Sequence, residues 1–153
     1  MALDADTDKG RIFVVRHTFV NPKQFLLIGG VVLVALGVLG MVGVIGPTAD
    51  KSIFTKMNLD WWFDDAENWA HLVLGVVALI AAFVLPAGMQ RPLVMIVGVL
   101  GILVGLYSAF YRTTLLGANL ENPADTLLHL VVGAWALTAS WKNSEAAGPF
   151  SPT

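Results

Sequence analysis

The sequence predicts an all-α polytopic membrane protein, a four-transmembrane-helix bundle made of two parallel-duplicated helical hairpins. Three observations lead to this prediction: an apolar composition, four long apolar runs and one motif that occurs twice. The 153 residues are 56% hydrophobic and only 13% charged, and the mean hydropathy is +0.73. A soluble domain of this size cannot bury so much apolar surface, so a lipid bilayer is the expected environment.

Four apolar runs are long enough to cross the hydrocarbon core, which takes roughly 20 helical residues. They cover about residues 24–45, 67–85, 93–111 and 124–141. The expected transmembrane domain therefore spans residues 21–141, with an outer loop at residues 47–66. Residues 1–20 precede it as an N-terminal segment, and residues 142–153 follow it as a tail.

The distribution of lysine and arginine predicts the orientation of the chain. One side of the bundle carries the basic residues before the first run, between the second and third runs, and after the fourth. These are Lys9, Arg11, Arg16, Lys23, Arg91 and Lys142, against Lys51, Lys56 and Arg112 on the other side. Because cytoplasmic loops carry the excess of basic residues, both termini are expected in the cytoplasm.

An acidic residue, a histidine and a glycine recur at spacings of four near the start of the second and fourth runs. The copies are Glu67, His71 and Gly75, and Asp125, His129 and Gly133. This spacing places the three residues on one helix face, which continues through small residues in both copies. Because ionisable groups are costly in lipid, both faces are expected to point into the protein. Each repeat has an even number of crossings, so the two hairpins should share one orientation.

Helix ends and close helix contacts are also visible in the sequence. Asn21-Pro22 and Asn122-Pro123 each combine an asparagine that can cap free amides with a proline suited to the first helical position. Pro47 is expected to end the first helix, and Arg91-Pro92 to open the third. Seams of small residues on the first and on the third helix predict that each of these helices packs tightly against a neighbouring helix. The seams are Gly30, Gly37, Gly40, Gly43 and Gly46 in the first helix, and Gly98, Gly101, Gly105 and Ser108 in the third.

The repeated carboxylates and histidines allow several interpretations. In a structural one, each carboxylate caps its helix start and bonds to the histidine four residues later. In a second one, His71 or His129 is an axial ligand of haem or a chlorophyll-type pigment. Gly75 and Gly133, one turn away, would then leave room for the flat macrocycle.

A third interpretation brings both copies together as a metal site of two imidazoles and two carboxylates, suited to zinc or non-haem iron. Its ligands would be Glu67, His71, Asp125 and His129. This site requires the second and fourth helices to meet at that level. A fourth interpretation is movement of protons or a solute along the acidic-histidine pairs.

Aromatic residues near the helix ends predict anchors at the membrane interface, where indole and phenol rings favour the headgroup layer. Trp61, Trp62 and Phe63 precede the second helix, and Tyr111 and Arg112 follow the third. Contact with a partner or a pigment is the alternative role for the three adjacent aromatic residues.

Several classes of function find no support in the sequence. Basic residues are few and the net charge is -2, so there is no nucleic-acid footprint. Cysteine is absent, which excludes disulfides and thiolate metal sites. No nucleophile constellation, phosphate-binding glycine loop or HExxH motif is present, so an enzyme is not expected.

We therefore expect a non-catalytic accessory subunit of a larger membrane complex, in contact with lipid and with other membrane protein subunits. The first alternative is a haem- or (bacterio)chlorophyll-binding subunit of an electron-transfer or photosynthetic assembly that uses His71 or His129. The second alternative is a small metal-binding or transport-related membrane protein.

Residues 122–133, Asn-Pro-Ala-Asp-Thr-Leu-Leu-His-Leu-Val-Val-Gly, carry a motif with a weaker counterpart at residues 68–75. In this motif the chain resembles a family of small bacterial four-helix integral membrane proteins that is described only as a domain of unknown function. The resemblance covers the second to fourth helices best and does not extend to the Trp61-Trp62-Phe63 loop. It implies the four-helix fold and a bacterial cytoplasmic membrane. It implies no activity, because none is established for the family.

Overall fold

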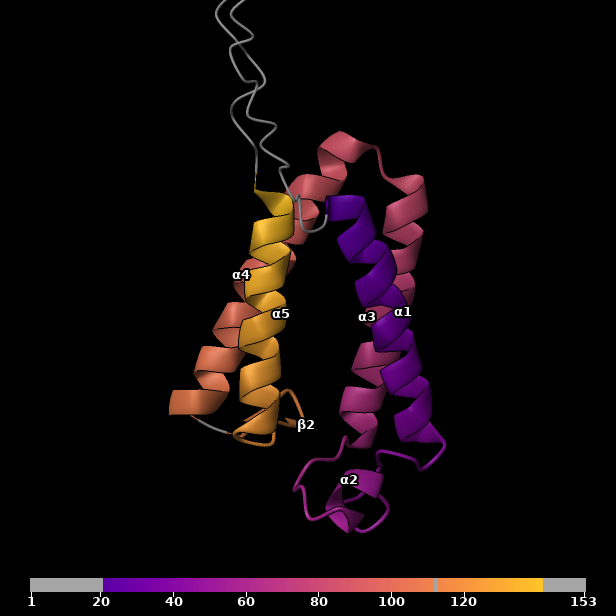
Figure 1. The fold of residues 1–153 in the computed structure, drawn as a ribbon, viewed down its shortest axis with the longest axis vertical. Helices are drawn as coiled ribbons and strands as arrows, with labels where there is room; N and C mark the ends of the chain where they lie inside the picture. Colours follow the sequence, from indigo (N-terminus) through magenta and orange to yellow (C-terminus); the bar gives the residue numbers. More distant parts are fainter. Residues whose placement is uncertain (1–20, 112, 142–153) are drawn as a thin grey trace, which may run out of the picture.

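The computed structural model describes residues 21–111 and 113–141, which are mostly helical (Figure 1). In chain order the elements are α1 (Pro22–Met41), α2 (Ile53–Lys56), α3 (Asp65–Val84), α4 (Ala87–Phe110), β1 (Thr114–Leu115), β2 (Ala118–Asn119) and α5 (Ala124–Ser140). Among these residues α1, α3 and α4 are long and apolar enough to cross a membrane, whereas α5 is a shorter apolar helix of 17 residues. The structure thus confirms a helical chain with apolar helices suited to a lipid bilayer. The N-terminal segment, the C-terminal tail and Arg112 lie outside the described residues.

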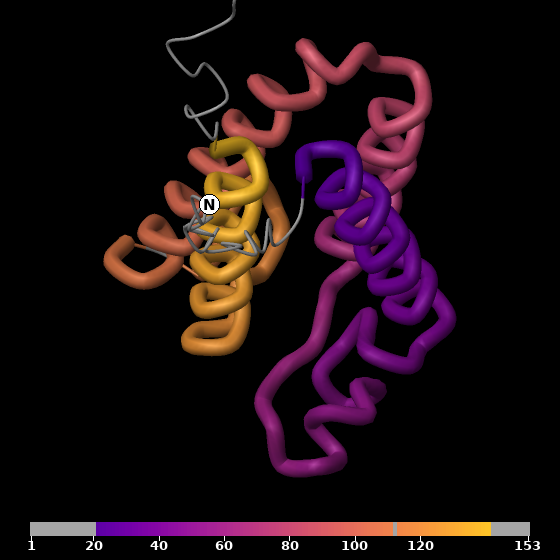
Figure 2. The backbone as a smooth tube through the Cα atoms, turned by 45° about the horizontal axis from the view of Figure 1, so that its top comes forward, coloured from indigo at the N-terminus to yellow at the C-terminus, as the bar shows by residue number. Residues whose placement is uncertain are grey.

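The long helices form two antiparallel hairpins, α1 with α3 and α4 with α5 (Figures 1 and 2). α1 begins and α5 ends at the same end of the molecule, which we call the termini end (Figure 1). The opposite end carries α2 and the two-stranded sheet of β1 and β2, and we call it the loop end. β2 also contacts α3, so the segment between α4 and α5 reaches the other hairpin.

Capping boxes start α1 and α3. At α1 the side chain of Asn21 accepts a bond from the amide N of Gln24 at 2.9 Å, and the Gln24 side chain accepts one from Asn21 N at 3.0 Å. These two bonds satisfy amides that a helix start leaves free, and they confirm the predicted cap. Asp64 and Glu67 form the same arrangement at the start of α3.

The predicted cap of α5 at Asn122 is wrong. Pro123 occupies the cap position without a side-chain bond, and Asn122 Nδ2 donates to the carbonyl of Ser108 at 3.4 Å. The carboxylate of Asp125 instead reaches back to the amide N of Glu121, at 2.8 Å. This bond fixes the chain just before α5, so the asparagine side chain is free to bond to α4.

α1 ends at Met41, four residues earlier than predicted. A turn follows where the helix was expected to continue. Gly43 has a φ of +82°, which glycine adopts without strain, and the amide N of Val44 bonds back to Leu39 O at 2.9 Å. Pro47 therefore follows a turn and does not itself end the helix. Gly43 and Gly46 lie outside the helical part of the predicted seam.

α4 begins at Ala87, six residues before the predicted start, so Arg91-Pro92 lies inside the helix. The physical reason is a tight turn at Pro86, which takes the cap position of α4 directly after the end of α3. Gln90 is 5% exposed and donates through Nε2 to two carbonyls near the end of α3, at 2.8 and 3.1 Å. These bonds satisfy carbonyls that a helix end leaves free and hold α3 and α4 together.

Small residues let the two helices of each hairpin touch through their backbones. A Cβ built on Gly75 of α3 would lie 2.8 Å from Gly30 O on α1. A Cβ built on Gly133 of α5 would lie 2.9 Å from Gly98 O on α4. Only glycine avoids these clashes, so the predicted close packing along these helix faces is confirmed.

Further contacts recur at the same sequence intervals in both hairpins. The intervals are counted from Gly30 in α1 and from Gly98 in α4. In each hairpin, the residues seven and ten positions later are small and face the partner helix. The pairs are Gly37 with Leu72 and Gly40 with Asn68 in one hairpin, and Gly105 with Leu130 and Ser108 with Thr126 in the other. The contact pattern of one hairpin is therefore repeated in the second.

An apolar core joins the hairpins at the termini end. It consists of Phe25, Leu26, Ala81, Ala82, Val94, Ala136 and Ala139. The ring of Phe25 on α1 also packs edge-on against Trp135 on α5, with centroids 4.7 Å apart. Ala82 and Ala136 belong to the small faces that the repeated motif predicts to point inwards, and both are buried.

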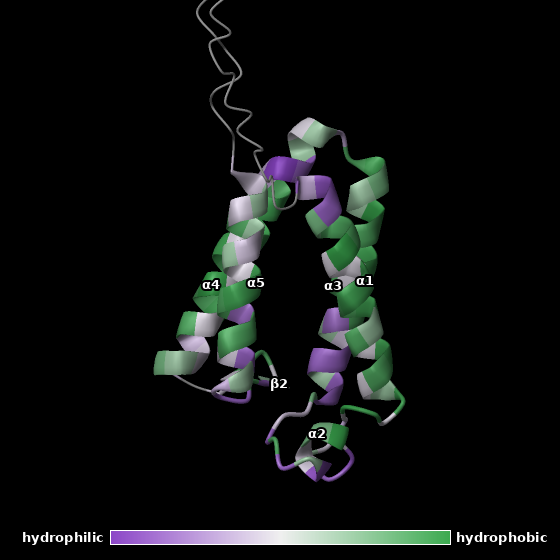
Figure 3. Cartoon of the chain, viewed as in Figure 1, coloured by the Kyte–Doolittle hydropathy of each residue, from purple (hydrophilic) through white to green (hydrophobic). Residues whose placement is uncertain are grey.

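The outward faces of the helices are apolar as well (Figure 3). Val31 on α1, Val73 on α3, Ile96 on α4 and Leu127 on α5 are 53 to 63% exposed. Large exposed apolar surfaces are unusual on soluble monomers. Lipid is therefore the natural surrounding of these faces.

Gly75→Ala tests the backbone contact within the first hairpin. The new Cβ would lie 2.7 Å from Val34 N and 2.8 Å from Gly30 O, so we expect the free energy of unfolding to fall by about 1–3 kcal/mol. Gly29→Ala is the matched control, because nothing lies within 4 Å of its Cβ. Thermal unfolding in detergent, followed by circular dichroism, measures both variants. Equal midpoints would contradict the contact.

Candidate carboxylate site

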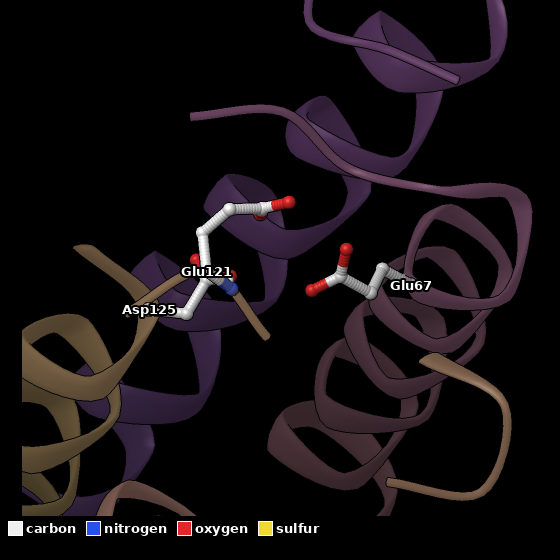
Figure 4. A group of neighbouring side chains, drawn as sticks. All are labelled: Glu67, Glu121 and Asp125. Atoms are coloured by element: carbon white, nitrogen blue, oxygen red, sulfur yellow. Dashed lines mark hydrogen bonds between the residues drawn. The ribbon is translucent and has the colours of Figure 1, made fainter. Parts of the chain in front are cut away.

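Three carboxylates from the two hairpins converge at the loop end (Figure 4). Glu67 lies in the first turn of α3, Asp125 in the first turn of α5, and Glu121 in the segment just before α5. One oxygen of each lies within 4.8 Å of the others. Glu67 is 4% exposed and Asp125 is 1% exposed. We call these three residues the carboxylate cluster.

The capping box of α3 positions Glu67. Its Oε2 accepts a bond from the amide N of Asp64 at 3.1 Å, and Asp64 Oδ1 accepts one from Glu67 N at 2.8 Å. The second carboxylate oxygen of Asp64 accepts a bond from the amide N of Asn119 at 2.7 Å. Because Asn119 belongs to β2, this bond ties the start of α3 to the segment that leads to α5.

Asp125 links the hairpins directly. Its Oδ1 accepts a bond from Trp61 Nε1 at 2.8 Å, and Trp61 lies in the loop before α3. Its Oδ2 accepts the bond from Glu121 N described above. Both carboxylate oxygens of Asp125 therefore accept a hydrogen bond. Hydrogen bonds from N–H groups to an ionised carboxylate are among the stronger hydrogen bonds in proteins.

Glu121 is the least satisfied member of the cluster. Its Oε1 accepts a bond from Asn119 Nδ2, whereas its buried Oε2 has no hydrogen-bond partner among the described residues. Burial raises the pKa of Glu121, and the neighbouring charge of Asp125 raises it further. A proton or a metal ion is therefore favoured at this carboxylate.

The hydrogen-bond donors to the cluster are neutral groups. They are backbone amides, the indole of Trp61 and the side-chain amide of Asn119, and no basic side chain bonds to the cluster in residues 21–111 and 113–141. Removing a carboxylate from water costs roughly several kcal/mol unless its charge is compensated. The arrangement therefore favours a positive ligand, either protons or a metal ion.

The spacing of the oxygens fits a metal ion. Oxygen ligands lie about 2.3–2.6 Å from Ca²⁺ and about 2.0–2.1 Å from Mg²⁺, so two oxygens on opposite sides of one ion are about 4–5 Å apart. The cluster oxygens all lie within 4.8 Å of one another, so no two of them are farther apart than one Ca²⁺ ion can span. Oxygen-only ligands suit calcium, magnesium or manganese better than zinc.

The predicted histidines lie one helical turn beyond the carboxylates. His71 packs against Phe63 with ring centroids 4.9 Å apart, and its Nδ1 is buried without a partner among the described residues. His129 Nδ1 bonds to the carbonyl O of Asp125 at 2.7 Å. Because a carbonyl only accepts, Nδ1 of His129 carries the proton in this bond.

The structure brings together only part of the predicted metal site. Glu67 and Asp125 meet, but His71 and His129 are not among the ligand atoms that lie within 4.8 Å of one another. Glu121 is the third member of that group instead. The predicted bond between each carboxylate and the side chain of the histidine four residues later is not formed in the described residues, because both carboxylates bond to the donors named above.

Gly75 and Gly133 do not provide space for a macrocycle beside the histidines. Each faces the backbone of the partner helix, where even a Cβ would lie 2.7–2.8 Å from an amide N. A haem or chlorophyll ring is far larger than a methyl group. The space that the pigment interpretation requires at these glycines is therefore taken by helix packing.

Two of the three aromatic residues before α3, Trp61 and Phe63, pack against other side chains of the protein. Phe63 is 2% exposed and meets Trp61 edge-on, with centroids 5.3 Å apart, while Trp62 is half-buried. Trp61 thus contacts Asp125 and Phe63 contacts His71, and the anchoring role of these residues stays a prediction. Tyr111 does suit an anchor, because it is 80% exposed and stacks on Tyr107.

Sequence reasoning missed Glu121 as a site residue, although a signal was present. Glu121 lies four residues before Asp125, the same spacing that relates Asp125 to His129. The Asn122-Pro123 pair marks a helix start, which places Glu121 in a loop and hides the pattern.

Trp61→Phe should weaken the contact between the hairpins at the loop end. The variant keeps an aromatic ring beside Phe63 but removes the N–H that Asp125 Oδ1 accepts. A hydrogen bond to a charged group contributes about 1.5–3 kcal/mol, so we expect a fall of this size in the free energy of unfolding. Denaturant unfolding in detergent measures the change.

Trp62→Phe is the matched control, since Trp62 is half-buried and its indole donates no hydrogen bond within the described part of the chain. Trp61→Phe is also measured in an Asp125→Ala background. If it costs as much there as in the native chain, the bond to Asp125 is not the cause.

Comparison with protein-family models, curated proteins and solved structures finds no significant match to this chain. The resemblance to the uncharacterised four-helix family therefore stays a prediction, and the function is inferred from the residues of the chain itself.

Proposed function

We propose that this protein is a non-catalytic, four-span membrane protein that binds a divalent metal ion at the carboxylate cluster, where the ion joins the two hairpins. The observation that carries this proposal is the convergence of Glu67, Glu121 and Asp125, whose oxygens lie within 4.8 Å of one another. Glu67 belongs to the first hairpin and the other two belong to the second. A single ion would therefore contact both hairpins.

Electrostatic repulsion supports the need for such an ion. Two unit charges 4.8 Å apart repel by about 3.5 kcal/mol at an effective dielectric constant of about 20. This repulsion opposes the contact between the hairpins at the loop end. A divalent ion replaces the repulsion with attraction, whereas a proton on Glu121 only removes part of it.

The proposal includes a fourth membrane span and a duplication. α5 has 17 residues, about 25 Å at about 1.5 Å per residue, which is at the short end of the range for a transmembrane helix. It runs beside α4 (Figure 1), so we propose that it crosses the bilayer with it. The recurrence of glycine contacts at equal intervals supports an origin of the two hairpins by duplication.

The proposed orientation places the carboxylate cluster outside the cytoplasm. The basic residues before α1 and after α5 outnumber those of the two outer loops, so the positive-inside rule puts the termini end in the cytoplasm. The loop end then faces the outer side of the membrane. Calcium sites of extracellular protein modules have dissociation constants of about 10⁻⁴–10⁻³ M, and these values set the ion concentrations for a binding test.

The accessory role within a larger membrane assembly is also part of the proposal. Exposed apolar faces on all four long helices suit neighbouring subunits as well as lipid. Purification in a mild detergent tests this role: co-purifying membrane subunits support it, and a stable monomer that migrates alone contradicts it. The absorption spectrum of the same sample tests the pigment alternative, which requires a Soret or far-red band that is lost in His71→Ala or His129→Ala.

Thermal unfolding tests the metal site. Chelator-treated protein in detergent is titrated with Ca²⁺, Mg²⁺ or Mn²⁺ up to about 10–100 mM, about 100 times a dissociation constant of about 10⁻⁴–10⁻³ M. A ligand at about 100 times its dissociation constant stabilises a protein by about 2.7 kcal/mol, so we expect the midpoint to rise by about 5–10 °C with at least one ion.

Glu67→Gln and Glu121→Gln keep the shape of the side chains and should each remove most of this rise. Asp60→Asn is the matched control, because Asp60 is an exposed carboxylate in the loop before α3. It should leave the rise unchanged. No rise with any of the three ions, or an equal rise in Glu121→Gln, would contradict the site.

The pH dependence of the same experiment separates metal from protons. Because burial and the nearby Asp125 raise the pKa of Glu121 from 4.5 to about 8, the folded metal-free protein binds more protons than the unfolded chain between about pH 4.5 and pH 8. Its stability should therefore fall as the pH rises through that range. A saturating metal ion displaces the proton and should abolish this fall. A fall of equal size with and without the ion would show that protons alone occupy the cluster.

A further inference from the structure

An apolar groove runs along the outward side of α4 in its loop-end half. It has a volume of about 560 Å³ and is lined by Leu100, Leu103, Val104, Phe110 and Tyr111, with Leu115 of β1 across from them. Leu103 is 55% exposed and Phe110 is 77% exposed, so the groove is open to the surroundings of the helix. It lies on the α4 surface and is separate from the carboxylate cluster.

The end of the groove is built by the chain folding back on α4. Tyr107 Oη donates to the carbonyl O of Thr114 at 3.3 Å, which holds β1 against the last turns of the helix. The rings of Tyr107 and Tyr111 stack nearly parallel with centroids 6.0 Å apart. β1 then places Leu115, which is half-buried, against the groove.

The length and polarity of the groove match one leaflet of a bilayer. From Leu100 to Tyr111 it spans 11 helical steps, about 16 Å at about 1.5 Å per step, and half of a hydrocarbon core of about 30 Å is about 15 Å. The lining changes from aliphatic at Leu100 to phenolic at Tyr107 and Tyr111. Phenol rings favour the headgroup level, so the aromatic end lies where a lipid headgroup begins.

A single extended hydrocarbon chain matches this shape, because the groove runs along the helix axis for about the depth of one leaflet and its lining is apolar until the two tyrosines. We propose that the groove binds one acyl chain of a phospholipid from the outer leaflet, with its headgroup beside Tyr111.

Photo-crosslinking of the full chain in nanodiscs tests this proposal. The probe is a phosphatidylcholine that carries a diazirine in its acyl chain, diluted into ordinary phosphatidylcholine, and labelled peptides are identified by mass spectrometry. We expect the label to concentrate on residues 100–115 and to saturate at a low fraction of probe. Labelling equal to that of the outward face of α3, or labelling that rises linearly with the probe, would overturn the proposal.

Two variants fill or open the groove. Leu103→Trp should reduce the label on residues 100–115 several-fold, whereas Ile80→Trp on α3, whose native side chain is equally 55% exposed, should leave it unchanged. Leu115→Ala removes the side chain from β1 without changing α4 and should also reduce the label. Thermal midpoints confirm that each variant is folded. If neither groove variant lowers the label, or if a protein crosslink replaces the lipid crosslink at these residues, the proposal is wrong.

Discussion

Buried negative charge is the constraint on which the loop end depends. Glu67 and Asp125 lie in the first turns of their helices, where free amides and the helix dipole favour a carboxylate. Both are nevertheless cut off from water and must find donors inside the protein. Asp125 finds them at Trp61, in the loop of the other hairpin, and at Glu121 N. The folding of both loops at the loop end therefore depends on satisfying these two helix starts together.

The backbone contacts of the hairpins explain why the site forms between them and not within one of them. At Gly75 and Gly133 the partner helix lies so close that no side chain or ligand can enter. Each hairpin is therefore closed along its seam, and the hairpins meet through the apolar core at the termini end and through polar bonds at the loop end. The carboxylate cluster lies at this polar contact between the hairpins.

Local patterns predicted the helices and the inward faces, because apolar runs and spacings of four report directly on helix surfaces. They also predicted Glu67 and Asp125 as partners. They did not predict the start of α4, because Pro92 resembles a first helical residue and the turn at Pro86 depends on bonds from Gln90. The contact between Trp61 and Asp125 joins residues 64 positions apart. No periodicity contains such a contact, so this bond between the two hairpins could not be predicted from the sequence.

The two copies of the motif contribute unequally to the carboxylate cluster. Four residues before Glu67 stands Phe63, and four residues before Asp125 stands Glu121. In the first copy the apolar ring packs on His71 and adds no charge, whereas in the second copy the same position supplies the third carboxylate. If both hairpins descend from one ancestor, symmetric copies would contribute equal numbers of carboxylates to the cluster. The substitution of one acidic residue on one side only makes a single, asymmetric oxygen site shared by both hairpins.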